Sequence, residues 1–109
     1  MLQHLQLHLK RTEILNLVDR IVARGQHAVW QRVRDRVASM SKPHARGYIR
    51  VRAALVIERE LSIAIAQMDG LNDIQTQYVH ELVRDELIER ILSDAGRLSR
   101  ATQPLRRAA

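Results

Sequence analysis

The sequence predicts an all-α fold, a small antiparallel bundle of three long helices. Apolar residues recur at helical spacing through most of the chain, which is the main signal for helices that share a core. The chain holds only two prolines and four glycines, too few for the many turns of a β architecture. Residues that end or start helices gather at 39–43 and 68–73, which divides the chain into three helical segments.

The first long helix is expected over residues 13–38, with Thr12 as its N-cap and an amphipathic lead-in at residues 1–11. Its apolar residues follow a helical stripe: Ile14, Val18, Ile21, Val22, Val29, Val33 and Val37. Gly25 lies within this stripe and interrupts it. The sequence therefore predicts either one helix with a kink at Gly25 or two helices joined there. In the second case the first helix is broken at this residue.

The central helix is expected over residues 44–68, and the other two helices are expected to pack around it. Counted at about 100° per residue, its apolar residues occupy three sides of the helix. These sides hold Tyr48, Val51 and Leu55; Ile49, Val56 and Ile63; and Ile57, Leu61 and Met68. A helix that is apolar on every side is normally buried on every side, so we expect this helix to be covered all round.

Residues 49–57 also alternate in part between apolar and charged or small side chains, as a β-strand does. The whole stretch is far longer than a usual strand and is rich in alanine, which favours a helix. Ser41 is placed to cap it, Pro43 suits its first turn, and Gly70 can end it. We therefore assign this stretch to a helix.

The last helix is predicted to follow a turn at residues 68–73 and to run to about Leu98. Asn72 and Gln75 have the spacing of a capping box, in which each side chain bonds the backbone N–H of the other residue. Two apolar stripes follow: Leu71, Ile74, Tyr78 and Leu82 on one, and Val79, Val83, Leu87 and Ile91 on the other. By length the chain is one domain, which we place at residues 1–98 with a flexible basic tail at 99–109.

Charge is distributed unevenly along a chain whose net charge is +6. Residues 1–57 hold eleven Lys or Arg against three Asp or Glu, whereas residues 58–95 hold three Arg against nine Asp or Glu. A turn near Gly70 makes the central and last helices antiparallel neighbours, so basic and acidic segments face each other. Reflection about that turn places Arg52 near Glu89, and exposed pairs of this kind set helix order more than stability.

No catalytic motif, cofactor site or small-molecule site is recognisable in the sequence, so we expect no enzyme. The absence of cysteine excludes disulfides and thiolate chemistry. His4 and His8 have i, i+4 spacing, but two histidines alone do not make a closed metal site. The segment at His80 begins like a zinc-protease helix but has Arg84 where the second histidine is needed. Three carboxylates are expected to pair with basic side chains rather than to bind a cation: Glu81, Asp85 and Glu89.

The sequence does not indicate a membrane protein, and we expect a cytoplasmic location. Residues 1–11 mix leucine with glutamine and histidine and lack the continuous apolar run of a signal peptide. The central stretch is long enough to cross a bilayer, but its charged residues would lie in or near the hydrocarbon. These residues are Arg46, Arg50, Arg52, Glu58, Arg59 and Glu60.

Three helices of this length carry more apolar surface than one small bundle covers, so we expect an apolar strip to stay exposed. We therefore expect a non-catalytic protein–protein interaction or regulatory protein that self-associates. A two-fold homodimer is the simplest form, joined through the last helix or the far side of the central one, and a heteromer with a partner protein is the alternative. The residues assigned to self-association are Val79, Val83, Leu87 and Ile91.

Nucleic-acid binding is the alternative function, because the first half of the chain and its C-terminal end are rich in arginine. The arginines assigned to phosphate contacts are Arg32, Arg36, Arg46, Arg50, Arg106 and Arg107. Against this stand the acidic last helix, which repels phosphate, and the lack of interleaved aromatic residues. The arginine-rich composition, with 16 Arg and 2 Lys, is equally explained by a GC-rich genome.

Overall fold

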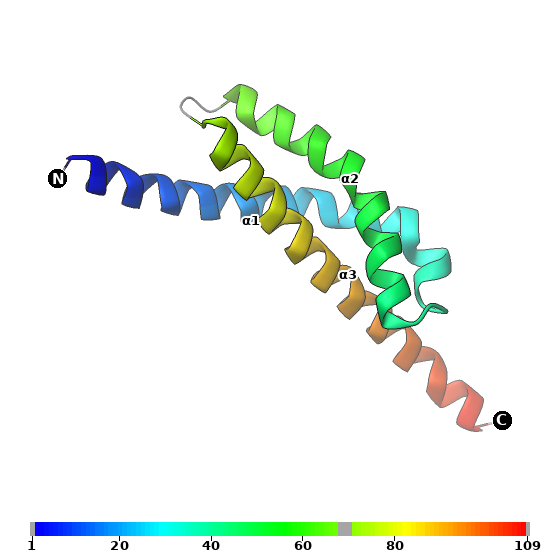
Figure 1. The fold of residues 1–109 in the computed structure, drawn as a ribbon. Coiled ribbons are helices and arrows are strands. Elements are labelled where there is room, and N and C mark those ends of the chain that lie inside the picture. The colour runs from blue at the N-terminus through cyan, green and yellow to red at the C-terminus, as the bar shows by residue number, and fades with distance from the viewer. Residues whose placement is uncertain (1, 68–70, 109) are drawn as a thin grey trace.

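The computed structural model describes residues 2–67 and 71–108, and the side chains of residues 11–67 and 71–100. It contains three α-helices and, within these residues, no strand: α1 (Leu2–Val37), α2 (Lys42–Gln67) and α3 (Asp73–Ala108). Successive helices run in opposite directions, so α2 and α3 form a hairpin and α1 crosses it (Figure 1). Each helix packs against both others. The predicted all-α bundle of three long helices is confirmed.

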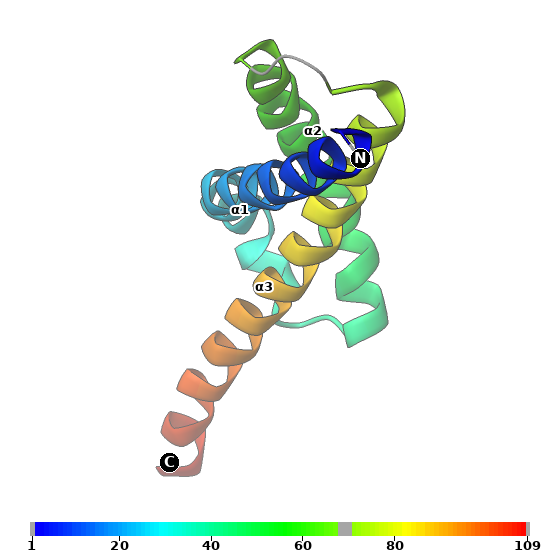
Figure 2. The ribbon, with the colours of Figure 1, turned by 90° about the vertical axis from the view of Figure 1, so that its left-hand side faces the viewer.

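The bundle is elongated, measuring 66 × 24 × 22 Å along its principal axes. Figures 1 and 2 show that the last turns of α3 extend well beyond the region where the three helices pack together. α3 continues as a helix to Ala108, past the end expected near Leu98. Helical hydrogen bonds are local, so a helix can extend past its last core residue. The mobility expected of residues 99–109 stays a prediction.

The core is made of one apolar stripe from each helix, and no polar or charged residue is buried among the side chains described. The stripe predicted for the first helix is buried throughout, and Leu17 joins it. From α2 the core takes Ala45, Ile49, Ala53, Val56, Ile57 and Leu61. From α3 it takes Val79, Val83, Leu87, Ile88, Ile91 and Ala95.

α1 is one helix through Gly25, so the break at this residue does not occur. Gly25 is buried where α1 meets the two other helices. A Cβ atom placed there would lie 3.5 Å from Val56 Cγ1 and 3.6 Å from Leu87 Cδ1. These are ordinary contact distances, so the three helices leave room for a small side chain but not for a large one at this position.

The predicted caps at the start of α2 and α3 are confirmed. The His44 N–H donates to Ser41 Oγ (3.4 Å), and Pro43 lies in the first turn of α2. The Gln75 N–H donates to Asn72 Oδ1 (2.8 Å) while the Asn72 N–H donates to Gln75 Oε1 (3.2 Å), a complete capping box.

Two other helix-end assignments have different outcomes. The prediction of Thr12 as an N-cap is wrong, because α1 already begins at Leu2 and Thr12 is an interior helical residue. Residues 2–11 of the expected amphipathic lead-in therefore belong to the same helix. The C-cap assigned to Gly70 lies outside the described residues.

An ion pair links the two helices of the hairpin, although not the predicted one. Arg46 Nη1 lies 2.7 Å from Glu89 Oε1, which confirms that a basic stretch of α2 faces the acidic side of α3. Arg52 instead lies over the ring of Tyr48, 5.1 Å from its centroid. The predicted pairing of Arg52 with Glu89 is wrong. Counting residues outward from a turn shows which helix ends are adjacent, whereas side-chain packing decides which residues of the two helices are in contact.

We predict that Gly25→Ala raises the free energy of unfolding by about 0.5–1 kcal/mol, because alanine favours the helix and its Cβ would meet ordinary contact distances. Gly25→Leu should lower it by about 1–3 kcal/mol, since a larger side chain would overlap Val56 and Leu87. Urea denaturation followed by circular dichroism measures both. Gly47→Ala, at an open position of α2 with nothing within 4 Å, is the matched control and should be stabilising as well. A destabilising Gly25→Ala would contradict the packing distances.

A double-mutant cycle should detect coupling between Arg46 and Glu89 of about 0.2–1 kcal/mol, the range of exposed ion pairs. The variants are Arg46→Glu, Glu89→Arg and the double reversal, with thermal unfolding as the measurement. Arg52→Glu combined with Glu89→Arg is the control cycle and should be additive. Coupling in the control but not in the first cycle would restore the register expected from the sequence.

Candidate protein-interaction surface

The outer side of α2 carries large apolar side chains that the bundle does not cover. Val51 is 72% exposed and Leu55 is 76% exposed. These residues are four positions apart and therefore lie one above the other on the same side of the helix. The expectation that the central helix is covered on every side is wrong, because α1 and α3 bury residues on two of its apolar sides and leave Val51 and Leu55 of the third exposed.

Basic and aromatic side chains flank these apolar residues. Arg52 stacks over the half-buried Tyr48, and Arg59 is exposed one turn after Leu55. On a helical wheel all five residues fall within about 100° of one another. We refer to Tyr48, Val51, Arg52, Leu55 and Arg59 as the α2 outer face.

A second apolar patch lies at the start of α3. Ile74 is 82% exposed and Tyr78 is 52% exposed. Together with Asp73, Gln77 and Glu81 they line a shallow groove of about 430 Å³. Gln77 Nε2 donates to Glu81 Oε1 (3.4 Å). The carboxylates of Asp73 and Glu81 give the groove an acidic edge. We refer to these five residues as the α3 groove.

The stripe that the sequence assigned to self-association is in the core instead. Val79, Val83, Leu87 and Ile91 are each 0% exposed, packed between α1 and α2. The other predicted stripe of α3 is the open one, since Ile74 and Tyr78 belong to it, while Leu71 and Leu82 are partly buried. Both stripes have i, i+4 spacing, and therefore spacing alone does not distinguish the buried one.

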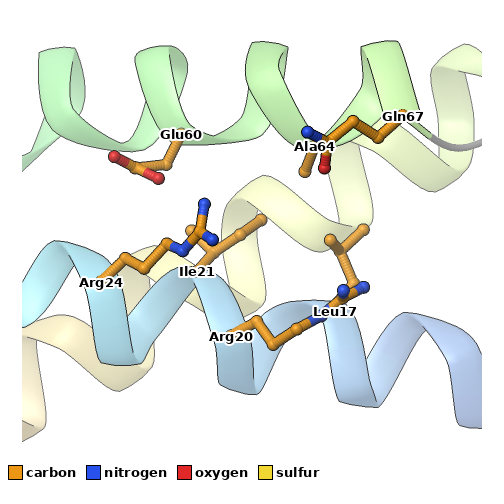
Figure 3. A pocket seen from close by; sticks show the side chains of 7 residues that line it. All are labelled: Leu17, Arg20, Ile21, Arg24, Glu60, Ala64 and Gln67. Atoms are coloured by element: carbon orange, nitrogen blue, oxygen red, sulfur yellow. The ribbon is translucent and has the colours of Figure 1, made fainter.

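A pocket of about 210 Å³ lies between α1 and α2 (Figure 3). Its lining residues are Leu17, Arg20, Ile21, Arg24, Glu60, Ala64 and Gln67. In Figure 3 the guanidinium of Arg24 and the carboxylate of Glu60 extend toward each other from opposite helices. The lining therefore combines guanidinium, carboxylate and amide groups with apolar side chains and offers polar contacts to a bound group.

Two of the three carboxylates expected to pair with basic side chains do so, Asp85 and Glu89, whereas the contact of Glu81 is with a neutral amide. Asp85 Oδ1 lies 3.1 Å from Arg84 Nε, Glu89 pairs with Arg46, and Glu81 accepts from Gln77. Within the described residues no group of three or more His, Asp or Glu side chains is placed to hold a metal ion. The side chains of His4 and His8 lie outside the described part.

The arginines assigned to nucleic-acid contacts are distributed over the three helices. Arg32 and Arg36 are exposed on α1, and Arg50 is exposed on α2. Arg32 Nη1 donates to its own helix at the Ala28 carbonyl (3.0 Å), and Arg46 is held by Glu89. Arg36 lies in the last turn of α1, where a positive charge stabilises the helix end. The side chains of residues 106 and 107 are outside the described part.

None of the helices, in the ranges that the structure describes, has both the length and the apolar content needed to cross a membrane. Comparisons with protein-family models, with curated proteins and with solved structures found no match to this chain. The α2 outer face and the α3 groove are therefore the surfaces whose chemistry bears on function.

We predict opposite stability effects for two leucines that look alike in the sequence. Leu87→Ala should lower the free energy of unfolding by about 2–5 kcal/mol, because it leaves a cavity in the core. Leu55→Ala should change it by less than about 0.5 kcal/mol, because the side chain is exposed. Chemical denaturation at low protein concentration measures both. A large loss for Leu55→Ala under these conditions would place Leu55 inside a buried contact.

Proposed function

We propose that this chain is a non-catalytic protein that works through helical protein–protein contacts and self-associates. The observation that carries the proposal is the exposure of Val51 and Leu55 on the α2 outer face. Burying one such side chain contributes about 1.5–3 kcal/mol, so a partner that covers both gains substantially. Contiguous exposed apolar surface with a polar rim is typical of interaction sites.

The composition of the α2 outer face fits a protein partner. Interface hot spots are enriched in tyrosine and arginine, and this face combines both with two exposed aliphatic residues on a single helix. Two apolar residues at i, i+4 on a regular helix are the usual anchors of a helix that packs against another helix. The ring of Tyr48 under Arg52 also holds that arginine in place, which lowers the entropy lost on binding.

A non-catalytic role is supported by the chemistry of the pocket between α1 and α2. The pocket between α1 and α2 holds arginines, one glutamate, a glutamine and apolar residues, without a nucleophile and base in contact. General acid–base catalysis needs a positioned group with a pKa near the working pH. Glu60 is the only carboxylate in this lining, with no second acid or base beside it other than arginine, and therefore the pocket suits binding better than proton transfer.

Nucleic-acid binding is the competing proposal, and the exposed Arg32, Arg36 and Arg50 favour it. The pairing of Arg46 with Glu89 weakens it, because one of the assigned phosphate contacts is already neutralised. The acidic residues of α3 weaken it further by repelling phosphate. We rank it second for these reasons.

Affinity capture from a lysate of the native host, with and without nuclease, tests the proposal. The bait is compared with Val51→Ser/Leu55→Ser and with Leu15→Ser, which changes an exposed apolar residue of α1 outside the α2 outer face. We expect the wild type and the control to retain protein partners after nuclease treatment and the double variant to lose them. Equal melting temperatures of the three baits establish that any loss is a surface effect.

Two results would contradict the proposal. Partners that disappear with nuclease from all three baits would promote nucleic-acid binding. Identical protein partners on the wild type and on the double variant would remove the α2 outer face from the interaction.

A further inference from the structure

We propose that the α2 outer face of one copy docks in the α3 groove of a second copy of this chain, forming a two-fold dimer. This inference rests on the proposed function and names its partner. It assigns self-association to two exposed surfaces rather than to the buried stripe of Val79, Val83, Leu87 and Ile91.

The charges of the two surfaces are complementary. The α2 outer face carries two arginines, Arg52 and Arg59. Only one exposed carboxylate, Glu58, is next to it in the sequence, so the net charge of these three residues is positive. The α3 groove carries Asp73 and Glu81, with no basic residue among those that line it. Opposite potentials steer two such surfaces together and disfavour pairing of like with like, groove with groove or face with face.

The apolar anchors of the two surfaces have the same spacing. Val51 and Leu55 are four residues apart on α2, and Ile74 and Tyr78 are four residues apart on α3, which is a rise of about 6 Å in each case. With the two helices parallel, Val51 meets Ile74 while Leu55 meets Tyr78. Arg59 then lies about one turn beyond the apolar contact on one helix, and Glu81 lies about one turn beyond it on the other.

This parallel arrangement is available only between two chains. Within one chain α2 and α3 run antiparallel, joined by the Arg46–Glu89 ion pair, and both surfaces point away from the shared core. A two-fold axis that places α2 of one copy on α3 of the other also places the second α2 on the first α3. All four surfaces are thereby covered, and the assembly closes without further growth.

Charge reversal tests the pairing on the intact chain. The variants are Arg59→Glu, Glu81→Arg and the double variant Arg59→Glu/Glu81→Arg, with Arg34→Glu on α1 as the matched control. Sedimentation equilibrium at micromolar concentration measures the dimer dissociation constant, and circular dichroism checks the fold. We expect a wild-type dimer, an increase of about tenfold or more in the dissociation constant for each single reversal, and recovery to within about threefold in the double variant. The control should match the wild type.

Each contrary result is distinguishable from failure of the proposed function. A folded wild-type monomer of 12.6 kDa at all concentrations would overturn the second copy as partner, while loss of captured proteins by Val51→Ser/Leu55→Ser would still support the interaction role. A wild-type dimer insensitive to both single reversals, or two reversals that are strictly additive, would overturn the pairing of these two surfaces.

Discussion

Each helix in a three-helix bundle has only two neighbours, and this limit decides which apolar residues become core. α1 has one main apolar stripe, and the bundle buries it. α2 is apolar on three sides, and the two that include Ile49 and Ile57 supply its core residues, which leaves Val51 and Leu55 of the third side in solvent. The exposed surface of α2 is therefore a consequence of helix number rather than of poor packing.

Packing at the centre of the bundle depends on the small size of Gly25. Val56 of α2 and Leu87 of α3 both approach this position of α1, so the three helices meet around a residue without a side chain. Polar contacts lie at the edge of this core: Gln26 Nε2 donates to Asp94 Oδ2 (3.1 Å), and Arg90 Nη1 donates to Gln26 Oε1 (3.4 Å). No polar side chain is buried in the described core. These hydrogen bonds at its edge therefore favour one alignment of α1 against α3.

The same limit connects the fold to the proposed function. Once one stripe of α2 and one of α3 are used for the core, the remaining apolar residues lie on surfaces of opposite charge, basic around Leu55 and acidic around Ile74. In a dimer of such chains, the basic surface of each copy can be covered by the acidic surface of the other copy. Folding and self-association would then use the two apolar sides of the same helices.

Features that depend on residues within a few turns of one another were predictable from the sequence. The capping box of Asn72 and Gln75 and the buried valines at 29, 33 and 37 follow from spacing along a single helix. Only the tertiary structure decided which stripe of α3 is buried, that Arg46 rather than Arg52 pairs with Glu89, and that Leu55 is exposed while Leu87 is not. These outcomes depend on where and at what rotation the helices meet, and a helical period is the same for a stripe that faces the core and for one that faces solvent.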